Sequence, residues 1–375
     1  PKETTSGEGR VAATPDVVKR YAGLGFEVVV ESGAGSGSRI LDGEYEAAGA
    51  AIAADAASAL AGADVVLKVR RPSSEEIALI PSGALVIATM DPFGAEAEVS
   101  AMAAAGLTAV AMEFMPRITR AQVMDVLSSQ ANLAGYQAVI DAAEVYDRAF
   151  PMMMTAAGTV PAARVFVMGA GVAGLQAIAT ARRLGAVVSA TDVRPASKEQ
   201  VESLGAKFIA VEDEEFKAAE TAAGYAKPMS AEYQAKQAAL VAEHIKKQDV
   251  VITTALIPGR PAPRLVSSAM IASMRPGSVL IDLAVERGGN VEGAVAGEVV
   301  EVGAVKIVGH RNVAGRIAAT ASQLYARNLY AFVETLVDKE KKTLAVDFDD
   351  ELVKATVLTR GGAVVHPAFA PKEAA

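Results

Sequence analysis

The chain has 375 residues, which is long enough for two domains of ordinary size. It contains no cysteine, and its three histidines lie far apart, so disulfides, a thiolate nucleophile and a metal site are not expected. The net charge of -8 argues against a nucleic-acid surface, and no uncharged apolar run reaches the roughly 18 residues of a membrane span. These properties favour a soluble protein that binds neither metal nor nucleic acid.

The first 130 residues alternate between strand-like and helix-like segments, which is typical of an α/β domain. Thr14 and Pro15 resemble an N-cap followed by a first-turn proline, and residues 96–105 form an alanine-rich helical segment. The glycine-rich stretch 33–38 is interpreted as a turn, because no helix begins directly behind it. Strands are expected at residues 27–31, 65–69, 84–88 and 108–112.

The segment 115–130 joins this domain to a long helix. Thr119 and Gln122 have the spacing of a capping box, which predicts that the helix begins here. Gln122, Asp125 and Ser128 or Ser129 recur at intervals of three or four residues and would then form a polar stripe on an otherwise apolar helix. Such a stripe could orient the carboxamide and ribose of a nicotinamide; a helix cap and a solvated face are the alternatives.

Two long helical stretches, residues 122–148 and 312–337, flank the second half of the alternating pattern, and Asn312 is a good N-cap for the second. We expect a first α/β domain from residues 1–130 and 330–375, and a nucleotide-binding domain from residues 131–329. The strand-like segments 344–348 and 363–365 of the tail have no obvious partner in the second domain, so the tail would return to the first. The chain would cross between the two domains twice and leave a cleft between them.

The most informative stretch begins at residue 164. An apolar strand, residues 165–168, leads into Gly169-x-Gly171-x-x-Gly174, which opens a helix, with Val172 and Ala173 between the last two glycines. The three glycines have the spacing that allows a tight turn, close approach of a pyrophosphate, and close packing of helix on strand. The helix N-terminus would offer unpaired N–H groups to the phosphates. The alternative is a glycine-rich turn in some other α/β protein.

A second strand, residues 187–191, ends on Asp192, eighteen residues past Gly174. A carboxylate there can accept hydrogen bonds from an adenosine ribose, and it would repel a 2′-phosphate. The motif therefore favours NAD over NADP. Arg194, just beyond Val193, points the other way, because an arginine in this place is what an NADP site would use.

Further strands are expected at residues 207–211, 249–253, 278–283 and 305–309, which gives six and suits a doubly wound sheet. Thr254, Ala255, Leu256 and Asp282 would then lie near the crevice at the carboxyl ends of the strands. A turn or helix-cap carboxylate is the other interpretation of Asp282.

The connection from residue 212 to residue 235 is long for a compact α/β unit and carries Tyr225 and Met229. Loops of this kind are often lids that close over a ligand, and an idle surface loop is the alternative.

A general base is hard to find in this sequence. Oxidation of an alcohol or an amine needs a proton acceptor near the nicotinamide, and no histidine precedes His244, which leaves Lys68 as the plausible candidate in the first domain. Hydride transfer between two nicotinamide rings needs only their alignment and the exclusion of water. The sequence fits that chemistry better. Because it holds one convincing dinucleotide site, a second nucleotide would have to arrive on another protein.

Over essentially its whole length the chain resembles the NAD(H)-binding component, domain I, of the proton-translocating nicotinamide nucleotide transhydrogenases. The resemblance rests on the Gly169 motif with Asp192 and on five further stretches: 117–130, 152–161, 224–229, 281–290 and 306–310. It implies two Rossmann-like doubly wound domains around a cleft, joined by two long helices.

The resemblance also implies functional roles. Arg117, Gln122 and Asp125, with Ser128, would contact the nicotinamide and ribose of NAD(H), and Gln122 would also reach toward NADP(H). Tyr225 and Met229 would lie on a mobile loop that closes over the nucleotide. The other implied cofactor-binding residues are Gly169, Gly171, Val172, Ala173, Gly174, Asp192, Val193, Arg194, Thr254, Ala255 and Leu256.

Members of this family are homodimers of domain I that dock on an NADP(H)-binding domain III above a proton-conducting membrane domain II. The resemblance therefore implies a Si-specific transhydrogenase that is active only with its partner subunits. It implies a cytoplasmic protein, peripheral to the inner membrane through those partners, which reduces NADP with NADH while protons enter the cytoplasm.

Alanine dehydrogenase belongs to the same superfamily and is the alternative. Arg10, Lys68 and Asp282 match positions that such an enzyme uses for its keto acid and its chemistry. Its catalytic histidine is absent, because residues 90–92 read Met-Asp-Pro. Two departures concern the transhydrogenase resemblance: the first strand expected before Pro1 is missing from this sequence, and alanine at 314 replaces the usual proline.

Overall fold

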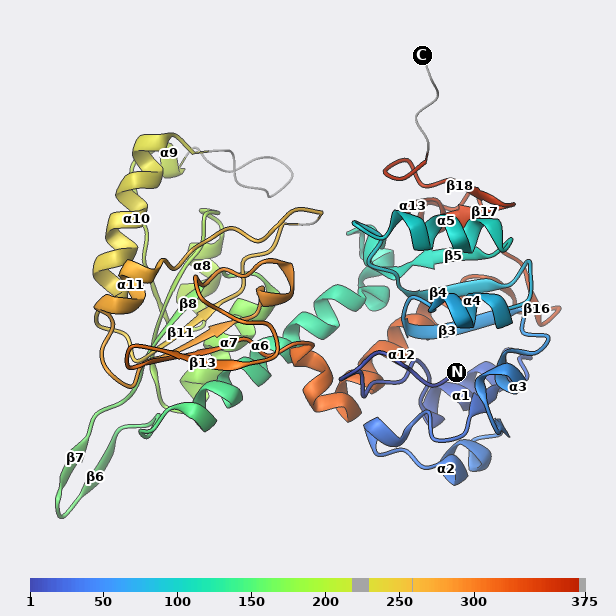
Figure 1. The fold of residues 1–375 in the computed structure, drawn as a ribbon, viewed down its shortest axis with the longest axis horizontal. Coiled ribbons are helices and arrows are strands. Elements are labelled where there is room, and N and C mark those ends of the chain that lie inside the picture. Colours follow the sequence, from blue (N-terminus) through green and yellow to red (C-terminus); the bar gives the residue numbers. More distant parts are fainter. Residues whose placement is uncertain (218–228, 258, 371–375) are drawn as a thin grey trace. The chain divides into compact units, whose positions relative to one another are not determined.

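The computed structural model describes residues 1–217, 229–257 and 259–370 (Figure 1). The chain divides into two compact units. Unit 1 comprises Pro1–Gln130 and Ala314–Ala375, and unit 2 comprises Ala131–Val313. Parallel strands with helices between them build both units, which confirms the expected α/β class.

Unit 2 is built on one seven-stranded sheet with the order β10-β9-β8-β11-β12-β14-β13. The order reverses between β8 and β11: the chain runs outward through β9 and β10 on one side and through β11, β12 and β14 on the other. This is the switch point of a doubly wound sheet, where ligands bind at the carboxyl ends of the strands. The strands are β8 (Arg164–Met168), β9 (Val187–Thr191), β10 (Lys207–Phe208), β11 (Val250–Thr253), β12 (Val279–Asp282), β13 (Val299–Val302) and β14 (Val305–Val308).

Side chains of the central strands alternate between two apolar cores, one on each face of the sheet. Val167 and Ile252 belong to the core that α6 and α7 cover, whereas Phe166 and Val251 belong to the core on the opposite face, with Ile245 of α10. The period of two thus puts both faces under helices, as a buried parallel sheet requires. The helices are α6 (Val126–Val145), α7 (Val172–Arg183), α8 (Ser197–Ser203), α9 (Glu214–Lys217), α10 (Ala231–Ile245) and α11 (Ser268–Ser273).

Unit 1 contains two separate parallel pieces of sheet, β1-β2 and β3-β4-β5. Its strands are β1 (Val29–Glu31), β2 (Ala51–Ala53), β3 (Val65–Arg70), β4 (Leu85–Thr89) and β5 (Thr108–Ala111). Its first helices are α1 (Pro15–Gly23), α2 (Asp42–Ala47), α3 (Ala56–Leu60), α4 (Ser74–Leu79) and α5 (Glu96–Ala104).

The C-terminal part of the chain completes unit 1. The N–H of Leu358 donates to the carbonyl oxygen of Ala109 in β5 at 2.8 Å, so the tail lies against the edge of that sheet. Tyr325, Leu329 and Phe332 of α12 are fully buried in an apolar core of unit 1 that also contains Val110 of β5. Residues 314–329 therefore belong to unit 1, although the sequence pattern predicted them to be part of the nucleotide-binding domain. The elements here are α12 (Ala318–Glu334), β15 (Val337–Asp338), β16 (Thr343–Leu344), α13 (Glu351–Thr356), β17 (Thr359–Arg360) and β18 (Ala363–Val364).

Several local expectations were wrong. Thr119 is not the N-cap of α6, because Thr119–Met124 is a separate 3-10 turn capped at Ile118, and α6 begins only at Val126. Asn312 does not start α12 either, since its φ of 46° is left-handed and the helix begins at Ala318. The connection 212–235 is partly helical, since α9 and the start of α10 lie within it.

Six strands of the structure were not expected from the sequence: β2, β6 (Met153–Thr155), β7 (Gly158–Val160), β13, β15 and β17. Antiparallel β13 forms the edge of the large sheet, and β6 with β7 forms a hairpin that projects from unit 2 (Figure 1). Of the expected strand 344–348, only Leu344 lies in a strand, as the second residue of β16. Among the described residues, no helix is long and apolar enough to cross a membrane.

Candidate nucleotide-binding site

The turn after β8 has the geometry that its glycines allow. Gly169 has φ +106°, a conformation that residues with a Cβ rarely adopt, and its N–H donates to the carbonyl oxygen of Thr191 at 2.9 Å. A Cβ on Gly169 would collide with Oγ1 of Thr254. The turn therefore lies between the ends of β9 and β11, at the switch point of the sheet.

Gly171 and Gly174 lack side chains for different reasons. Gly174 lies in the first turn of α7, and a Cβ there would overlap the carbonyl oxygen of Gly169. Gly171 is the N-cap of α7, and a Cβ on it would meet nothing within 4 Å. The space beside Gly171 is thus open where backbone N–H groups at the start of α7 need partners, which fits a pyrophosphate.

Asp192 lies directly beyond β9 and is fixed on both sides. Its Oδ2 accepts from the N–H of Ala170 at 2.7 Å, and its Oδ1 accepts from Nε of Arg194 at 2.9 Å. Burial alone would raise the pKa of Asp192, but the hydrogen bonds and charge of Arg194, with the N–H of Ala170, hold it below its usual value. Asp192 is therefore an ionised carboxylate that connects the glycine turn to the end of β9.

The segment after β11 forms the other side of the crevice. Oγ1 of Thr254 donates to the carbonyl oxygen of Gly169 at 3.0 Å, which ties this segment to the glycine turn. Ala255 is held at both its N–H and its carbonyl oxygen by the amide of Asn290, at 3.0 and 2.9 Å. Exposed apolar side chains lie at the start of α7 and on the loops after β9 and β11: Val172, Val193, Leu256 and Ile257. They could contact a flat apolar group such as adenine.

Asn290 is a residue that the sequence pattern did not reveal. It is fully buried and also donates to the carbonyl oxygen of Pro263, so it holds two loops together. Its only sequence signal is the run Gly288-Gly289-Asn290, which belongs to the stretch 281–290 of the family resemblance. Gly289 has φ +77°, and a Cβ there would lie 2.7 Å from Asp282.

Asp282 has a structural role. Its side chain is buried, and its two oxygens accept from the N–H groups of Ala284 and Val291, both at 2.9 Å. The interpretation as a turn carboxylate therefore describes it better than a place in the crevice.

Tyr225 lies outside the described residues. Met229 is partly buried against the core that α6 and α7 cover. Two contacts join α9 to the start of α10, near the two ends of the connection 212–235. Oγ of Ser230 donates to Glu215 at 2.6 Å, and the rings of Phe216 and Tyr233 stack.

In unit 1, the segment 115–130 does not form the expected stripe on one helix. Asp125 caps α6 instead: its Oδ1 accepts from the N–H of Ser128 at 2.8 Å and its Oδ2 from the hydroxyl of Ser128 at 2.6 Å. Arg117 and Gln122 lie outside the helix with exposed side chains. Arg117 and Gln122 are thus exposed residues that precede α6, whereas Asp125 and Ser128 fix the first turn of that helix.

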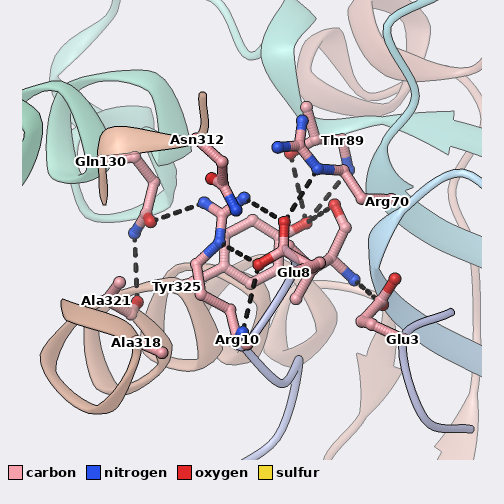
Figure 2. Close-up of polar contacts among 12 residues, drawn as sticks. Glu3, Glu8, Arg10, Arg70, Thr89, Gln130, Asn312, Ala318, Ala321 and Tyr325 are labelled. Carbon is pink, nitrogen blue, oxygen red and sulfur yellow. Dashed lines mark hydrogen bonds and ion pairs between the residues drawn. The ribbon is translucent and has the colours of Figure 1, made fainter. Parts of the chain in front are cut away.

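Polar contacts anchor this segment to α12. The hydroxyl of Ser129 donates to Asn328 at 2.7 Å, and the amide of Asn328 donates to the carbonyl oxygen of Val123 at 2.7 Å. Gln130 donates to the carbonyl oxygen of Ala321 at 3.1 Å and accepts from Arg10 at 2.8 Å (Figure 2). The backbone beside Gln122 is therefore held, although the side chain itself is exposed.

A cluster of buried charges lies next to Gln130. Figure 2 shows Glu8 between Arg10 and Arg70, with Arg10 donating to both carboxylate oxygens at 2.7 Å and Arg70 donating to one at 2.9 Å. Burial would raise the pKa of Glu8, but the hydrogen bonds and charge of Arg10 lower it overall. Lys68 is likewise buried and bonds Glu76 at 2.5 Å. Arg10 and Lys68, which the alternative enzyme would use, thus each have a carboxylate partner.

The structure brings together the predicted residues of unit 2: Gly169, Gly171, Val172, Gly174, Asp192, Arg194, Thr254 and Ala255 surround one switch point. Those of unit 1, Arg117, Gln122, Asp125 and Ser128, form a second group. Within the described ranges, no three His, Asp or Glu side chains are grouped so that they could hold a metal ion.

Known proteins resemble this chain over nearly its whole length. It is 58% identical over 374 residues to the first part of the NAD(P) transhydrogenase subunit alpha of Rhodospirillum rubrum, covering 98% of this chain and 97% of that protein. The crystal structure of transhydrogenase from Sinorhizobium meliloti has 70% sequence identity and a TM-score of 0.89, over 97% of this chain and 98% of that one. An alanine dehydrogenase of Halomonas elongata is 30% identical over 379 residues, covering 99% and 95%.

Two family models together span most of the sequence. The N-terminal domain of the alanine dehydrogenase/PNT family matches residues 1–134, and its C-terminal domain matches residues 138–367. The two models meet near residues 134–138, close to the first boundary between the units, whereas the C-terminal model also includes residues 314–367 of unit 1. This chain therefore belongs to the alanine dehydrogenase/PNT family.

Proposed function

We propose that this protein is the NAD(H)-binding component of a proton-translocating transhydrogenase. The observation that carries the proposal is the open space beside Gly171 at the start of α7, with the ionised Asp192 fixed next to it. The identity of 58% to a transhydrogenase alpha subunit, against 30% to an alanine dehydrogenase, supports this choice within the family.

The residues of unit 2 would hold NAD(H) by three kinds of contact. The backbone N–H groups at the start of α7 bind the pyrophosphate, and the absent side chain of Gly171 lets it approach. Asp192 accepts hydrogen bonds from the hydroxyls of the adenosine ribose. The exposed Val193 and Leu256 offer apolar contact to adenine. The pyrophosphate and ribose contacts are properties of the turn itself and do not depend on any other chain.

The residues of unit 1 would position the nicotinamide end. Arg117 and Gln122 have exposed side chains on a backbone that α12 holds in place, which suits residues that must reach a ligand. Asp125 is engaged with Ser128, so its role is to fix the start of α6 and thereby the segment that carries Gln122. The nicotinamide ring supplies the hydride chemistry, and these side chains orient it and exclude water.

The second nucleotide would be NADP(H), held on a partner domain. The described residues of unit 2 contain one glycine turn of the dinucleotide type, and no histidine precedes His244 to act as a base for an amino acid. A membrane subunit would couple hydride transfer to proton movement, and this chain would lie at the cytoplasmic face as a homodimer. The alternative, an NAD-dependent alanine dehydrogenase, lacks the histidine expected after the strand 84–89, where this chain has Met90-Asp91-Pro92.

Reconstitution tests the proposal. The purified chain is mixed with a separately purified NADP(H)-binding domain of a transhydrogenase, and hydride exchange between NADH and an NADP analogue is followed by absorbance. We expect exchange only in the mixture. The alternative predicts that the chain alone oxidises NADH with pyruvate and ammonium. Tight NADH binding without either reaction would identify a non-catalytic NADH sensor instead.

Gln122 gives a sharper test within the same assay. Gln122→Asn shortens the side chain by one methylene and keeps its amide, so hydride exchange should slow by on the order of tenfold or more because alignment is lost. The dissociation constant of NADH should change far less. An equal loss of affinity and rate would make Gln122 a binding residue only.

A further inference from the structure

Arg194 is engaged by the carboxylate that precedes it. Its guanidinium donates from Nε to Oδ1 of Asp192 at 2.9 Å and from Nη2 to Oδ2 at 3.1 Å, and Nη2 also donates to the carbonyl oxygen of Ala170 at 3.2 Å. Its backbone N–H donates to Oδ1 at 2.9 Å as well. Such a two-point pair of guanidinium and carboxylate is among the stronger polar contacts in proteins.

The position of this pair matters for the adenosine end of a nucleotide. Asp192 follows the last residue of β9 and also accepts from the N–H of Ala170 in the glycine turn. A guanidinium that bonds both Asp192 and Ala170 lies beside the place where a ribose would bind. The side chain of Arg194 is 35% exposed, so it can turn toward a ligand once its partner is removed.

We propose that Arg194 is a latent ligand for a 2′-phosphate and that Asp192 keeps it occupied. The inference rests on the proposed function, because it assumes that the adenosine ribose binds at Asp192. Asp192 then excludes NADP(H) in two ways: its charge repels a 2′-phosphate, and it engages the cation that would otherwise bind one. A protein that passes hydride between two nucleotides needs this exclusion, since NADP(H) in the NAD(H) site would block the exchange.

Binding measurements on the full chain test the inference. The dissociation constants of NADH and NADPH are measured from the fluorescence of the reduced nicotinamide for the wild type, Asp192→Ser, Asp192→Asn and the double variant Asp192→Ser with Arg194→Gln. Asparagine retains an acceptor for Ala170, so it protects the fold if serine does not. A charge-assisted hydrogen bond corresponds to roughly 10- to 100-fold in affinity.

We expect the wild type to bind NADH and to exclude NADPH. Each single variant at Asp192 should bind NADPH at least tenfold more tightly than the wild type does and NADH at least tenfold more weakly. The double variant should lose the gain for NADPH, because the guanidinium is gone while the carboxylate is still absent.

Other outcomes overturn the inference. If folded Asp192 variants gain no affinity for NADPH, Arg194 cannot serve a 2′-phosphate, and if the gain survives Arg194→Gln, another group does so. Failure of the wild type to bind NADH would count against the proposed function alone, because the response of the variants to NADPH is measured independently.

Discussion

Glu8 shows how much a single buried carboxylate can matter in this protein. Its side chain is 1% exposed and forms ion pairs with two guanidinium groups, those of Arg10 and Arg70. Removing one partner of a buried ion pair leaves the other charges without compensation, which costs far more than the loss of a surface pair. The extended segment before α1 has no helix or strand of its own, and these ion pairs are among the contacts that hold it in place.

We predict that Glu8→Gln lowers the free energy of unfolding by about 3 kcal/mol at pH 7. Because the pKa of Glu8 in the folded protein lies below its usual value of 4.5, the contribution is present above about pH 4.5 and is lost as the pH falls through that lower pKa. Urea unfolding of the wild type and the variant from pH 7 to pH 3 measures both effects.

Glu232 provides the matched control. It forms an ion pair with Lys236 at 2.7 Å on α10, and both side chains are more than half exposed. Glu232→Gln should change the free energy of unfolding by less than about 0.5 kcal/mol, since exposed pairs contribute little. Equal effects of the two substitutions would mean that the Glu8 cluster does not stabilise the fold.

At the scale of elements, α7 and the turn before it pack closely because glycines let one stretch of backbone approach another. Gly174 packs on the carbonyl oxygen of Gly169, and Gly135 of α6 packs on the carbonyl oxygen of Ala173. Both α6 and α7 thus use a glycine to pack against the backbone of residues 169–173. The sequence pattern identified the first of these contacts but not the second, because a lone glycine within a helix has no distinctive spacing.

Alanine substitutions at Gly171 and Gly174 should have different effects, the first on NADH binding and the second on stability. Gly174→Ala should lower the free energy of unfolding by about 2 kcal/mol, because the added Cβ overlaps Gly169 and must push α7 away from β8. Gly171→Ala should leave stability almost unchanged, since its Cβ meets nothing within 4 Å and its φ of -76° suits alanine. It should nevertheless weaken NADH binding by on the order of tenfold, because the methyl group occupies the space for the pyrophosphate.

Thermal unfolding and NADH titration of both variants decide the matter. If Gly171→Ala binds NADH as tightly as the wild type, the pyrophosphate does not approach this glycine. Loss of stability without loss of binding in that variant would likewise contradict the assignment of the open space.

The seven-stranded sheet of unit 2 was predictable from the sequence. Its central strands are buried on both faces and therefore form continuous apolar runs between turns. β13 was not predictable, since its four residues, Val-Val-Glu-Val, are short and mostly exposed at the edge of the sheet. In the candidate site, the glycines and Asp192 have a spacing that chemistry dictates. The predicted start of α6 is wrong because Thr119 and Gln122 match the capping-box pattern. Asp125, which does cap the helix, does not match that pattern.

At the scale of the whole molecule, the hairpin β6-β7 has an exposed apolar surface that suits contact with a second copy of the chain. Residues 151–159 are all exposed, and three of them are consecutive methionines, Met152, Met153 and Met154. An isolated two-stranded hairpin is marginally stable in water, and methionine-rich surfaces are common at binding interfaces. The hairpin is thus a strong candidate for contact with the second copy in the proposed homodimer.

We predict that Met154→Glu, at a side chain that is 79% exposed, shifts the protein from dimer to monomer. A buried charge at an interface opposes association, whereas the same charge on a free surface does not. Sedimentation velocity over a range of concentrations measures the change. Leu41→Glu, at a position 70% exposed in unit 1, is the control and should leave the dimer intact. A dimer that survives Met154→Glu would exclude this segment of the hairpin from the interface.

The insertion of unit 2 between two segments of unit 1 determines the order in which the protein can fold during synthesis. Residues 131–313 are contiguous and can close their sheet as soon as they leave the ribosome, whereas the first 130 residues must wait for α12 and the tail. Until then the apolar core that Leu329 and Phe332 complete stays open to solvent. The nascent chain would thus carry a finished nucleotide-binding unit beside an unfinished one, which is the stage at which it is most exposed to aggregation and most dependent on chaperones.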